Sequence, residues 1–282
     1  MKFGVLMFPT DYSIQPIELG RAAEERNFES IWFPEHTHIP ASRRTPWPGG
    51  ADLPKEYWHT HDPFVALGAV AGATSRIKLA TGICLVIERD PITLAKEIAS
   101  LDMISGGRFI FGIGGGWNAE EMENHGANFK ERWKIVREKI EAMKEIWTKD
   151  DAEYHGRYVN FDKIWSWPKP VQKPHPPIIL GSETKWARQR VVDYGDGWMP
   201  IFGMGQDLAG SVKDLRERAE KAGRDPDSIS LTMFGARPDK ESFKYLEGLG
   251  FERVVLPLPS EPAEKTLPRL DKYAEFIANF GA

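Results

Sequence analysis

The chain has 282 residues, of which 41% are hydrophobic and 28% charged, and its formal net charge is -4. This composition suits a globular protein with a sizeable core, and the absence of a basic excess argues against nucleic-acid binding. The single cysteine, Cys84, excludes an intramolecular disulfide framework and a cysteine-rich zinc site. No stretch approaches the roughly 20 apolar residues that a spanning helix needs, and the apolar run 1–8 is too short for a signal peptide. We therefore expect a cytoplasmic protein that binds no membrane.

Short apolar runs alternate with longer amphipathic segments along the whole chain, the pattern of strands followed by helices. Continuous apolar runs are typical of strands buried on both faces in a parallel sheet. In chain order, we predict strands at 2–8, 30–33, 77–86, 108–113, 177–180, 197–201, 228–234 and 253–256. We predict helices at 16–26, 63–74, 90–105, around 136–147, and at 184–194, 208–222, 240–249 and 263–280.

Eight strand–helix pairs without a break in composition predict an α/β fold, one (β/α)₈ TIM barrel that forms a single domain over 1–282. The stretches 37–61 and 150–177 are long, irregular and rich in proline. We expect the barrel to carry insertion loops at its carboxyl-terminal face. A doubly wound sheet is the alternative, although such a sheet usually has fewer strands.

The chemically unusual residues fall where predicted strands end, which in such a barrel is the active-site face. Glu35 and His36 follow the second strand, and a histidine there suits proton transfer near neutral pH. Because neighbouring side chains on a strand point to opposite faces, one of the two turns inward while the other turns away. A histidine hydrogen-bonded within a loop is the alternative interpretation.

Glycines mark three further strand ends. Gly82 lies within the third strand, which indicates a bulge or a close backbone approach. The run 112–116 is not a dinucleotide fingerprint, because Trp117 stands where the third glycine belongs. It forms either a backbone that a flat ring can approach or a flexible turn. Gly181 and Ser182 form either a phosphate cradle at a helix N-terminus or a plain helix cap.

Two His-x-His pairs raise the question of a metal centre. They are His36 with His38, and His59 with His61. Barrel metallohydrolases that use such a pair also need further ligands on later strands, and the predicted eighth strand carries no acid. We therefore predict no metal site.

Several motifs resemble the luciferase-like flavin oxidoreductases over essentially the whole chain. They are 32–36 (Trp-Phe-Pro-Glu-His), 90–96 with 101–109, 112–121, 176–178 with Gly181, and 195–198 (Gly-Asp-Gly-Trp). Within that family, the segment 34–40 and the loop 42–46 are most similar to the branch that uses the deazaflavin coenzyme F420.

The resemblance implies a barrel, often a homodimer, with a non-proline cis peptide near Gly82 and Ile83. It implies that Gly82, Ile83 and Cys84 support the central ring of the cofactor and that Glu35 contacts the polar edge of the ring. By the same resemblance, Gly115, Gly116 and Trp117 frame the ring or its phosphoribityl chain, and Gly181 with Ser182 binds phosphate. His36 matches the base of the sugar-phosphate dehydrogenases of this branch.

Two departures separate the chain from those dehydrogenases, since Pro40 replaces a tryptophan and Trp117 replaces an acidic glutamate. These departures argue against the sugar-phosphate reaction itself. From the resemblance as a whole, we expect an F420-dependent oxidoreductase that transfers a hydride to or from a small organic molecule, with His36 and Glu35 as the catalytic pair. An FMN-dependent monooxygenase of the same fold and a non-catalytic deazaflavin-binding protein are the alternatives. We further expect the loop 37–61 to cover the site, and Trp47, Tyr57, Trp58, Trp165 and Trp167 to line the substrate pocket.

Overall fold

The computed structural model describes residues 1–50, 52–204 and 207–280, and eight parallel strands in it close into a barrel. This confirms the predicted (β/α)₈ architecture. Around the barrel, the strands are β1 (Lys2–Leu6), β2 (Ser30–Phe33), β3 (Lys78–Thr81), β4 (Phe109–Ile113), β7 (Ile178–Gly181), β8 (Gly197–Met199), β9 (Ser230–Phe234) and β10 (Arg253–Pro257).

The first and last strands of the barrel close it. Lys2 pairs with Arg253 and Leu6 with Pro257, in parallel register. Beneath this seam, Arg253 donates hydrogen bonds of 2.7 and 2.8 Å to both carboxylate oxygens of Glu29, and its side chain is almost fully buried. The two ends of the sheet are therefore joined by backbone pairing and by a bidentate ion pair.

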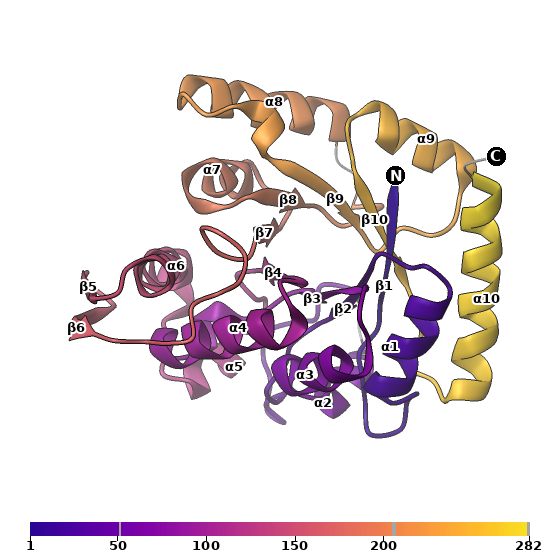
Figure 1. The fold of residues 1–282 in the computed structure, drawn as a ribbon, viewed down its shortest axis with the longest axis horizontal. Helices are drawn as coiled ribbons and strands as arrows, with labels where there is room; N and C mark the ends of the chain where they lie inside the picture. Colours follow the sequence, from indigo (N-terminus) through magenta and orange to yellow (C-terminus); the bar gives the residue numbers. More distant parts are fainter. Residues whose placement is uncertain (51, 205–206, 281–282) are drawn as a thin grey trace.

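Helices surround the barrel, as Figure 1 shows for α1, α3, α4 and α10. Asp62 and Asp90 cap α3 and α4, and both helices begin with proline, whose fixed φ suits the first turn. The helices are α1 (Pro16–Glu25), α2 (Glu56–His59), α3 (Pro63–Ala73), α4 (Pro91–Ser105), α5 (Ala119–Asn124), α6 (Arg132–Thr148), α7 (Lys185–Tyr194), α8 (Leu208–Lys221), α9 (Lys240–Gly248) and α10 (Ala263–Phe280), with short 3₁₀ turns η1 (Val86–Glu88), η2 (Phe129–Glu131) and η3 (Pro226–Ser228). In the described residues, no helix is both long and apolar enough to cross a membrane.

The core has two layers, because alternate residues of each strand point into the barrel or toward the helices. On β2, Trp32 belongs to the inner cluster and Phe33 to the outer one. The inner cluster consists of Trp32, Ala80, Ile110, Ile179, Met199 and Val255, with Leu6, Ile83 and Phe234 packed against it. This alternation decides which of the residues after each strand reach the barrel mouth.

Three segments differ from the sequence prediction. The third strand ends at Thr81, where the chain enters a cis peptide and then η1, so residues 82–86 are not strand. The helices α2 and α5 were not predicted, and at four and six residues both are too short to show a helical repeat.

A hairpin of β5 (Ala152–His155) and β6 (Asn160–Ile164) occupies part of the stretch predicted to be irregular. Figure 1 shows it beyond α6, outside the barrel. This stretch connects α6 to β7, so it lies toward the end of the barrel opposite to the loops that follow the strands. Trp165 and Trp167 are more than half exposed, and the Trp167 carbonyl accepts a hydrogen bond from Lys96 of α4. Neither tryptophan lines the barrel mouth.

Candidate functional site

The peptide bond between Gly82 and Ile83 is cis, as the family resemblance implied. It follows β3 directly, and the Ile83 side chain packs against the inner cluster of the barrel. A Cβ atom on Gly114 would lie 2.7 Å from Ile83 Cδ1, and one on Gly181 would lie 3.2 Å from Ile83 Cγ2. The ends of β3, β4 and β7 thus meet around one isoleucine, with backbone rather than side chains facing it on two sides.

The glycines after β4 turn the chain sharply into α5. Gly116 has φ +66°, which favours glycine, and a Cβ atom there would overlap with Met122. Gly115 lies against the indole of Trp133, whose ring stacks with the Arg190 guanidinium at 3.9 Å. The turn is therefore packed on its outer side, which favours a fixed shape over a flexible loop.

Gly181 and Ser182 lead from β7 to α7 without capping the helix. The cap is Thr184, whose hydroxyl accepts from the Ala187 N–H at 3.1 Å, so the Ser182 side chain is not the helix cap. Ser182 itself has φ +147°, which a residue with a side chain rarely adopts, and residues held in such conformations concentrate at ligand sites. Glu183 turns to the Ile201 N–H at 2.9 Å, a contact directed toward β8.

His36 forms the best-defined polar contact at the barrel mouth. Its Nδ1 atom lies 2.8 Å from Oε2 of Glu121, which is 1% exposed and projects from α5. No described protein group hydrogen-bonds to Nε2. A carboxylate on one ring nitrogen fixes the ring and its tautomer, so that the other nitrogen is left to exchange a proton with a ligand.

Aromatic side chains enclose His36. The rings of Tyr57 and Trp117 have centroids 5.1 and 5.9 Å from the imidazole, and Trp47 packs edge-on against Tyr57. Arg43 lies over the Trp117 ring at 5.4 Å. The loop 37–61 thus reaches the site, and it supplies apolar surface next to the imidazole.

Glu120 fastens this loop to α5. Its carboxylate accepts hydrogen bonds from the Arg44 N–H and side chain and from the Thr45 N–H and hydroxyl. The Thr45 hydroxyl bond is the main reason that the pKa of Glu120 falls to about 2. The other end of the loop is tied down where the His61 N–H donates to the Pro9 carbonyl at 2.7 Å.

Glu35 lies between the barrel and the helices and is 2% exposed. Its oxygens accept from the Leu85 N–H and from Arg89 Nε, both at 2.6 Å. Arg89 also pairs with Asp62 and Glu97, so three carboxylates surround one guanidinium. Both oxygens of Glu35 therefore have protein partners, on the opposite side of β2 from His36.

Cys84 lies on the same side as Glu35. It belongs to the outer cluster, and its thiol is fully buried. Burial raises the pKa of the thiol well above its usual range. Of the three residues expected beneath a ring system, only Ile83 thus packs against the inner cluster with its side chain, while Gly82 contributes backbone.

Sequence reasoning gave no role to three buried polar residues, Glu88, Asn118 and Glu121. Glu121 lies within the segment that carries the family resemblance, but only the fold shows its contact with His36. Both oxygens of Glu88, both polar atoms of the Asn118 amide and Oε1 of Glu121 are buried without a hydrogen-bond partner in the described part of the chain. Unsatisfied buried polar atoms are rare in folded proteins and concentrate at functional sites.

No group of three or more His, Cys, Asp or Glu side chains in the described residues is arranged to hold a metal ion. His38 instead lies 2.9 Å from the Thr37 hydroxyl and from the Asn124 amide, and His59 lies 2.9 Å from Asp11. The imidazoles of His38 and His59 therefore hydrogen-bond to neighbouring side chains.

Comparison with known proteins fixes the family. The model of the luciferase-like monooxygenases matches residues 2–238. The chain belongs to the luciferase-like monooxygenase family. Members of this family are oxidoreductases or monooxygenases, and both F420-dependent and FMN-dependent proteins are among the matches.

Three of the similar proteins align with this chain over essentially its whole length. An uncharacterised protein of Mycobacterium tuberculosis is 38% identical over 99% of both chains. The crystal structure of the monooxygenase RslO1 from Streptomyces bottropensis superposes with a TM-score of 0.83 at 21% identity over 100% of both chains. The coenzyme F420-dependent tetrahydromethanopterin reductase of Methanopyrus kandleri gives 0.74 at 18% over 99% of both chains. The two structures share the fold.

The residues at the mouth of this luciferase-like barrel fit a flavin or deazaflavin. Gly114 and Gly181 pack so closely against Ile83 that a Cβ atom at either position would crowd it, and this fixes Ile83 at the ends of β3, β4 and β7, where a flat ring could rest on it. The first turn of α7 follows Ser182 directly and suits a phosphate. The unsatisfied amide of Asn118 adds a donor and an acceptor next to the glycine turn.

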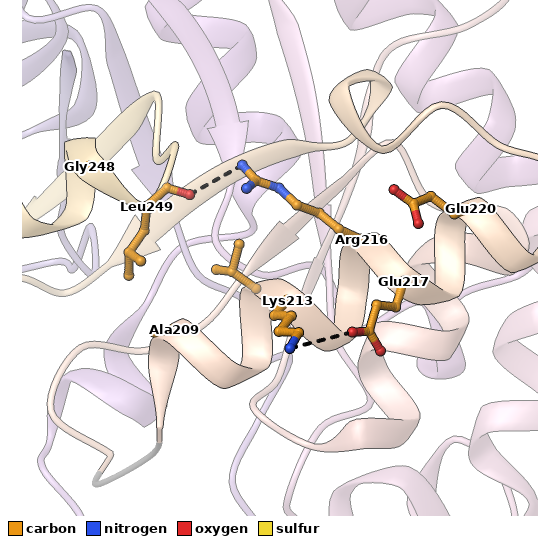
Figure 2. A pocket seen from close by; sticks show the side chains of 8 residues that line it. Ala209, Lys213, Arg216, Glu217, Glu220, Gly248 and Leu249 are labelled. Atoms are coloured by element: carbon orange, nitrogen blue, oxygen red, sulfur yellow. Dashed lines mark hydrogen bonds and ion pairs between the residues drawn. The ribbon is translucent and has the colours of Figure 1, made fainter.

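A groove of about 310 Å³ lies elsewhere, between α8 and the end of α9 (Figure 2). Its walls are held by the ion pair of Lys213 with Glu217 and by the bond from Arg216 to the Leu249 carbonyl. It is formed by outer helices and contains none of the predicted site residues, so we do not assign it to the cofactor.

Proposed function

We propose that the protein is an F420-dependent oxidoreductase that transfers a hydride between the deazaflavin and a small organic substrate. When bound, the deazaflavin supplies the carbon that accepts or donates the hydride. The observation that carries the proposal is His36 at the barrel mouth, which the buried carboxylate of Glu121 orients and which Tyr57 and Trp117 flank. Hydride transfer to a carbonyl or alkene needs a proton donor, and hydride removal from the corresponding alcohol or saturated compound needs a proton acceptor; His36 serves as either.

Each residue of the site has a definite task in this proposal. Ile83 supports the ring from the barrel interior, and Gly181 with Ser182 binds the phosphate at the start of α7. His36 exchanges the proton through Nε2, and Glu121 holds the ring through Nδ1. Glu35, whose two oxygens are occupied, keeps the turn after β3 in place by its bond to the Leu85 N–H.

In this proposal, the substrate lies against the aromatic side chains of Tyr57, Trp117 and Trp47. Loop 37–61 covers it, because Glu120 holds the loop at Thr45 and the Pro9 carbonyl holds it at His61. Exclusion of water at such a site strengthens each electrostatic contact with the substrate. An apolar or aromatic carbonyl compound, or the corresponding alcohol, fits this lining best.

The deciding experiment is a fluorescence titration of the purified protein with the deazaflavin and, separately, with FMN. The proposal predicts submicromolar binding of the deazaflavin and weak binding of FMN. The reverse preference would assign the protein to the oxygen-using FMN monooxygenases, and binding of neither would remove the cofactor assignment. Binding without turnover over a broad substrate panel would favour a non-catalytic carrier. His36→Asn should bind the deazaflavin and lose turnover.

We also propose a homodimer, with the second half of α4 and the segment 165–171 at its interface. Ile104 is 65% exposed, Met103 46% and Trp167 58%, and exposed apolar side chains of this kind favour burial in an interface. Light scattering behind a sizing column should give twice the chain mass for the native protein. Ile104→Glu should give the monomer mass, whereas Val65→Glu on α3 serves as the matched control at a comparably exposed position.

A further inference from the structure

Glu88 is the most unusual acid of the structure. Its side chain is 0% exposed, and both carboxyl oxygens are buried without a hydrogen-bond partner in the described residues. It stands at the last position of η1, directly before Arg89. The mechanism above gives it no task, although it lies beside the residues that orient His36.

Three elements bring ionisable groups toward Glu88. From α5 come Glu121 and, one turn later, His125, whose Nε2 atom lies 3.7 Å from Glu88 Oε2. From the segment that follows β2 comes Glu35, and from α6 comes Lys139. An ionised Glu88 would therefore share this small volume with two other carboxylates.

The nearby cations are already engaged. Arg89 is surrounded by the carboxylates of Glu35, Asp62 and Glu97. Lys139 Nζ donates to the carbonyls of residues 86, 87 and 89, which fixes η1 but leaves no donor directed at Glu88. Burial lowers the pKa of His125, so this imidazole is uncharged at neutral pH.

We propose that Glu88 is an uncharged positioning residue of the proton-transfer site, which leaves the carboxylate of Glu121 as the single negative charge behind His36. The proposal deepens the proposed function and rests on it, since it concerns the histidine that exchanges the proton. Burial, followed by the carboxylates of Glu121 and Glu35, raises the pKa of Glu88 to about 9, in agreement with this geometry. A second charge at this position would strengthen the hold on the His36 proton and hinder its release.

Infrared spectroscopy of the protein without cofactor tests the charge of Glu88 directly. The wild-type protein at neutral pH should show the C=O stretch of a protonated carboxyl group, and Glu88→Gln should lose it. Glu121→Gln is the matched control on the neighbouring acid and should keep the band. A wild-type spectrum without this band, or a band that persists in Glu88→Gln, would overturn the proposal.

Nitrogen-15 spectra of the His36 ring test the link to proton transfer. The resonances, assigned through His36→Asn, should shift as Glu88 loses its proton near pH 9. The shift should vanish in Glu88→Gln and persist in Glu123→Gln, an exposed acid on the same helix. Ring resonances of the wild type that stay constant through this range would refute the link, even if no variant folds. Neither spectrum needs the deazaflavin, so their failure is distinct from failure of the proposed function.

Discussion

The Nδ1 atom of His36 lies 2.8 Å from Oε2 of Glu121, which follows it by 85 residues in the sequence. Both side chains are almost fully buried, and the contact joins the end of β2 to α5. In such a contact the carboxylate selects the tautomer that carries hydrogen on Nδ1 and leaves Nε2 as the reactive nitrogen.

Glu121→Gln should therefore disturb the proton step while the cofactor still binds. We expect turnover to fall about 10- to 100-fold, because the tautomer is no longer fixed. This is less than the roughly 100- to 10,000-fold that general acid–base catalysis contributes as a whole, since His36 itself is retained. The dissociation constant of the deazaflavin should stay within about threefold of wild type, since the amide and carboxylate are nearly isosteric. Glu123→Gln controls for the loss of a charge from α5. Equal turnover of both variants would show that Glu121 has no part in proton transfer.

Glu88 should make the protein less stable as the pH rises. Its carboxyl group has a pKa of about 9 in the folded protein and the ordinary value of 4.5 once unfolded. Between these values the folded state binds the extra proton, so the free energy of unfolding decreases with increasing pH. Glu88→Gln should remove this dependence and be more stable than wild type at pH 7, by up to about 3 kcal/mol. Urea denaturation at several pH values measures both slopes, and parallel slopes would contradict the expectation.

Arg89 should be among the costliest charged residues to replace. Arg89→Met would leave the 1% exposed side chain of Glu35 without its cation, and breaking a buried pair in this way costs about 3–5 kcal/mol. Chemical denaturation measures the loss. The double variant Arg89→Met with Glu35→Gln removes the stranded charge and should recover part of it. A double variant that is as unstable as the sum of its single changes would argue against coupling between the two.

Glu120 should control how firmly loop 37–61 is closed. Glu120→Ala removes the acceptor of several hydrogen bonds from Arg44 and Thr45. One charge-assisted bond of about 1.5 kcal/mol corresponds to roughly a tenfold larger open population, and trypsin cleavage after Arg44 should accelerate by at least about that factor. Glu123→Gln removes only the longer, exposed ion pair of Glu123 with Arg44 at 3.7 Å and should accelerate cleavage much less. An unchanged rate in Glu120→Ala would mean that other contacts hold the loop.

Ser182 should respond differently to glycine and to alanine. Its φ of +147° is open to glycine and unfavourable for residues with a Cβ atom, so Ser182→Gly should raise the free energy of unfolding by roughly 1 kcal/mol. Ser182→Ala retains the Cβ atom and should give no such gain. Thermal and urea denaturation compare the two, while phosphate binding of each variant reports the task of the hydroxyl. A gain in both variants would show that the backbone angle is not its cause.

The barrel was predictable because its signals are local. Continuous apolar strands and amphipathic helices repeat along the chain, and the alternation on β2 explains why Glu35 and His36 face opposite ways. The cis peptide after β3 followed from family resemblance, since nothing in the two residues Gly82 and Ile83 alone specifies it.

The partners of the site residues were not predictable, because they lie far away in the sequence. Glu121 approaches His36 only once β2 and β4 are neighbours of β3 in the closed sheet. Glu88 follows a strand that was predicted to run to residue 86, and its isolation depends on the engagement of Arg89 and Lys139 elsewhere. The cap of α7 was not predictable either. The positive φ of Ser182 is set by the fold, and Thr184 caps the helix in its place.

The pairing of β1 with β10 has a consequence for synthesis of the chain. Lys2 leaves the ribosome about 250 residues before its partner Arg253, so the edge of β1 that faces β10 has no strand beside it for most of translation. An unpaired strand edge is a template for association with other chains. The interval between these two residues is therefore the period in which the nascent protein depends most on chaperones, and shortening the chain before β10 should yield aggregates instead of a smaller folded barrel.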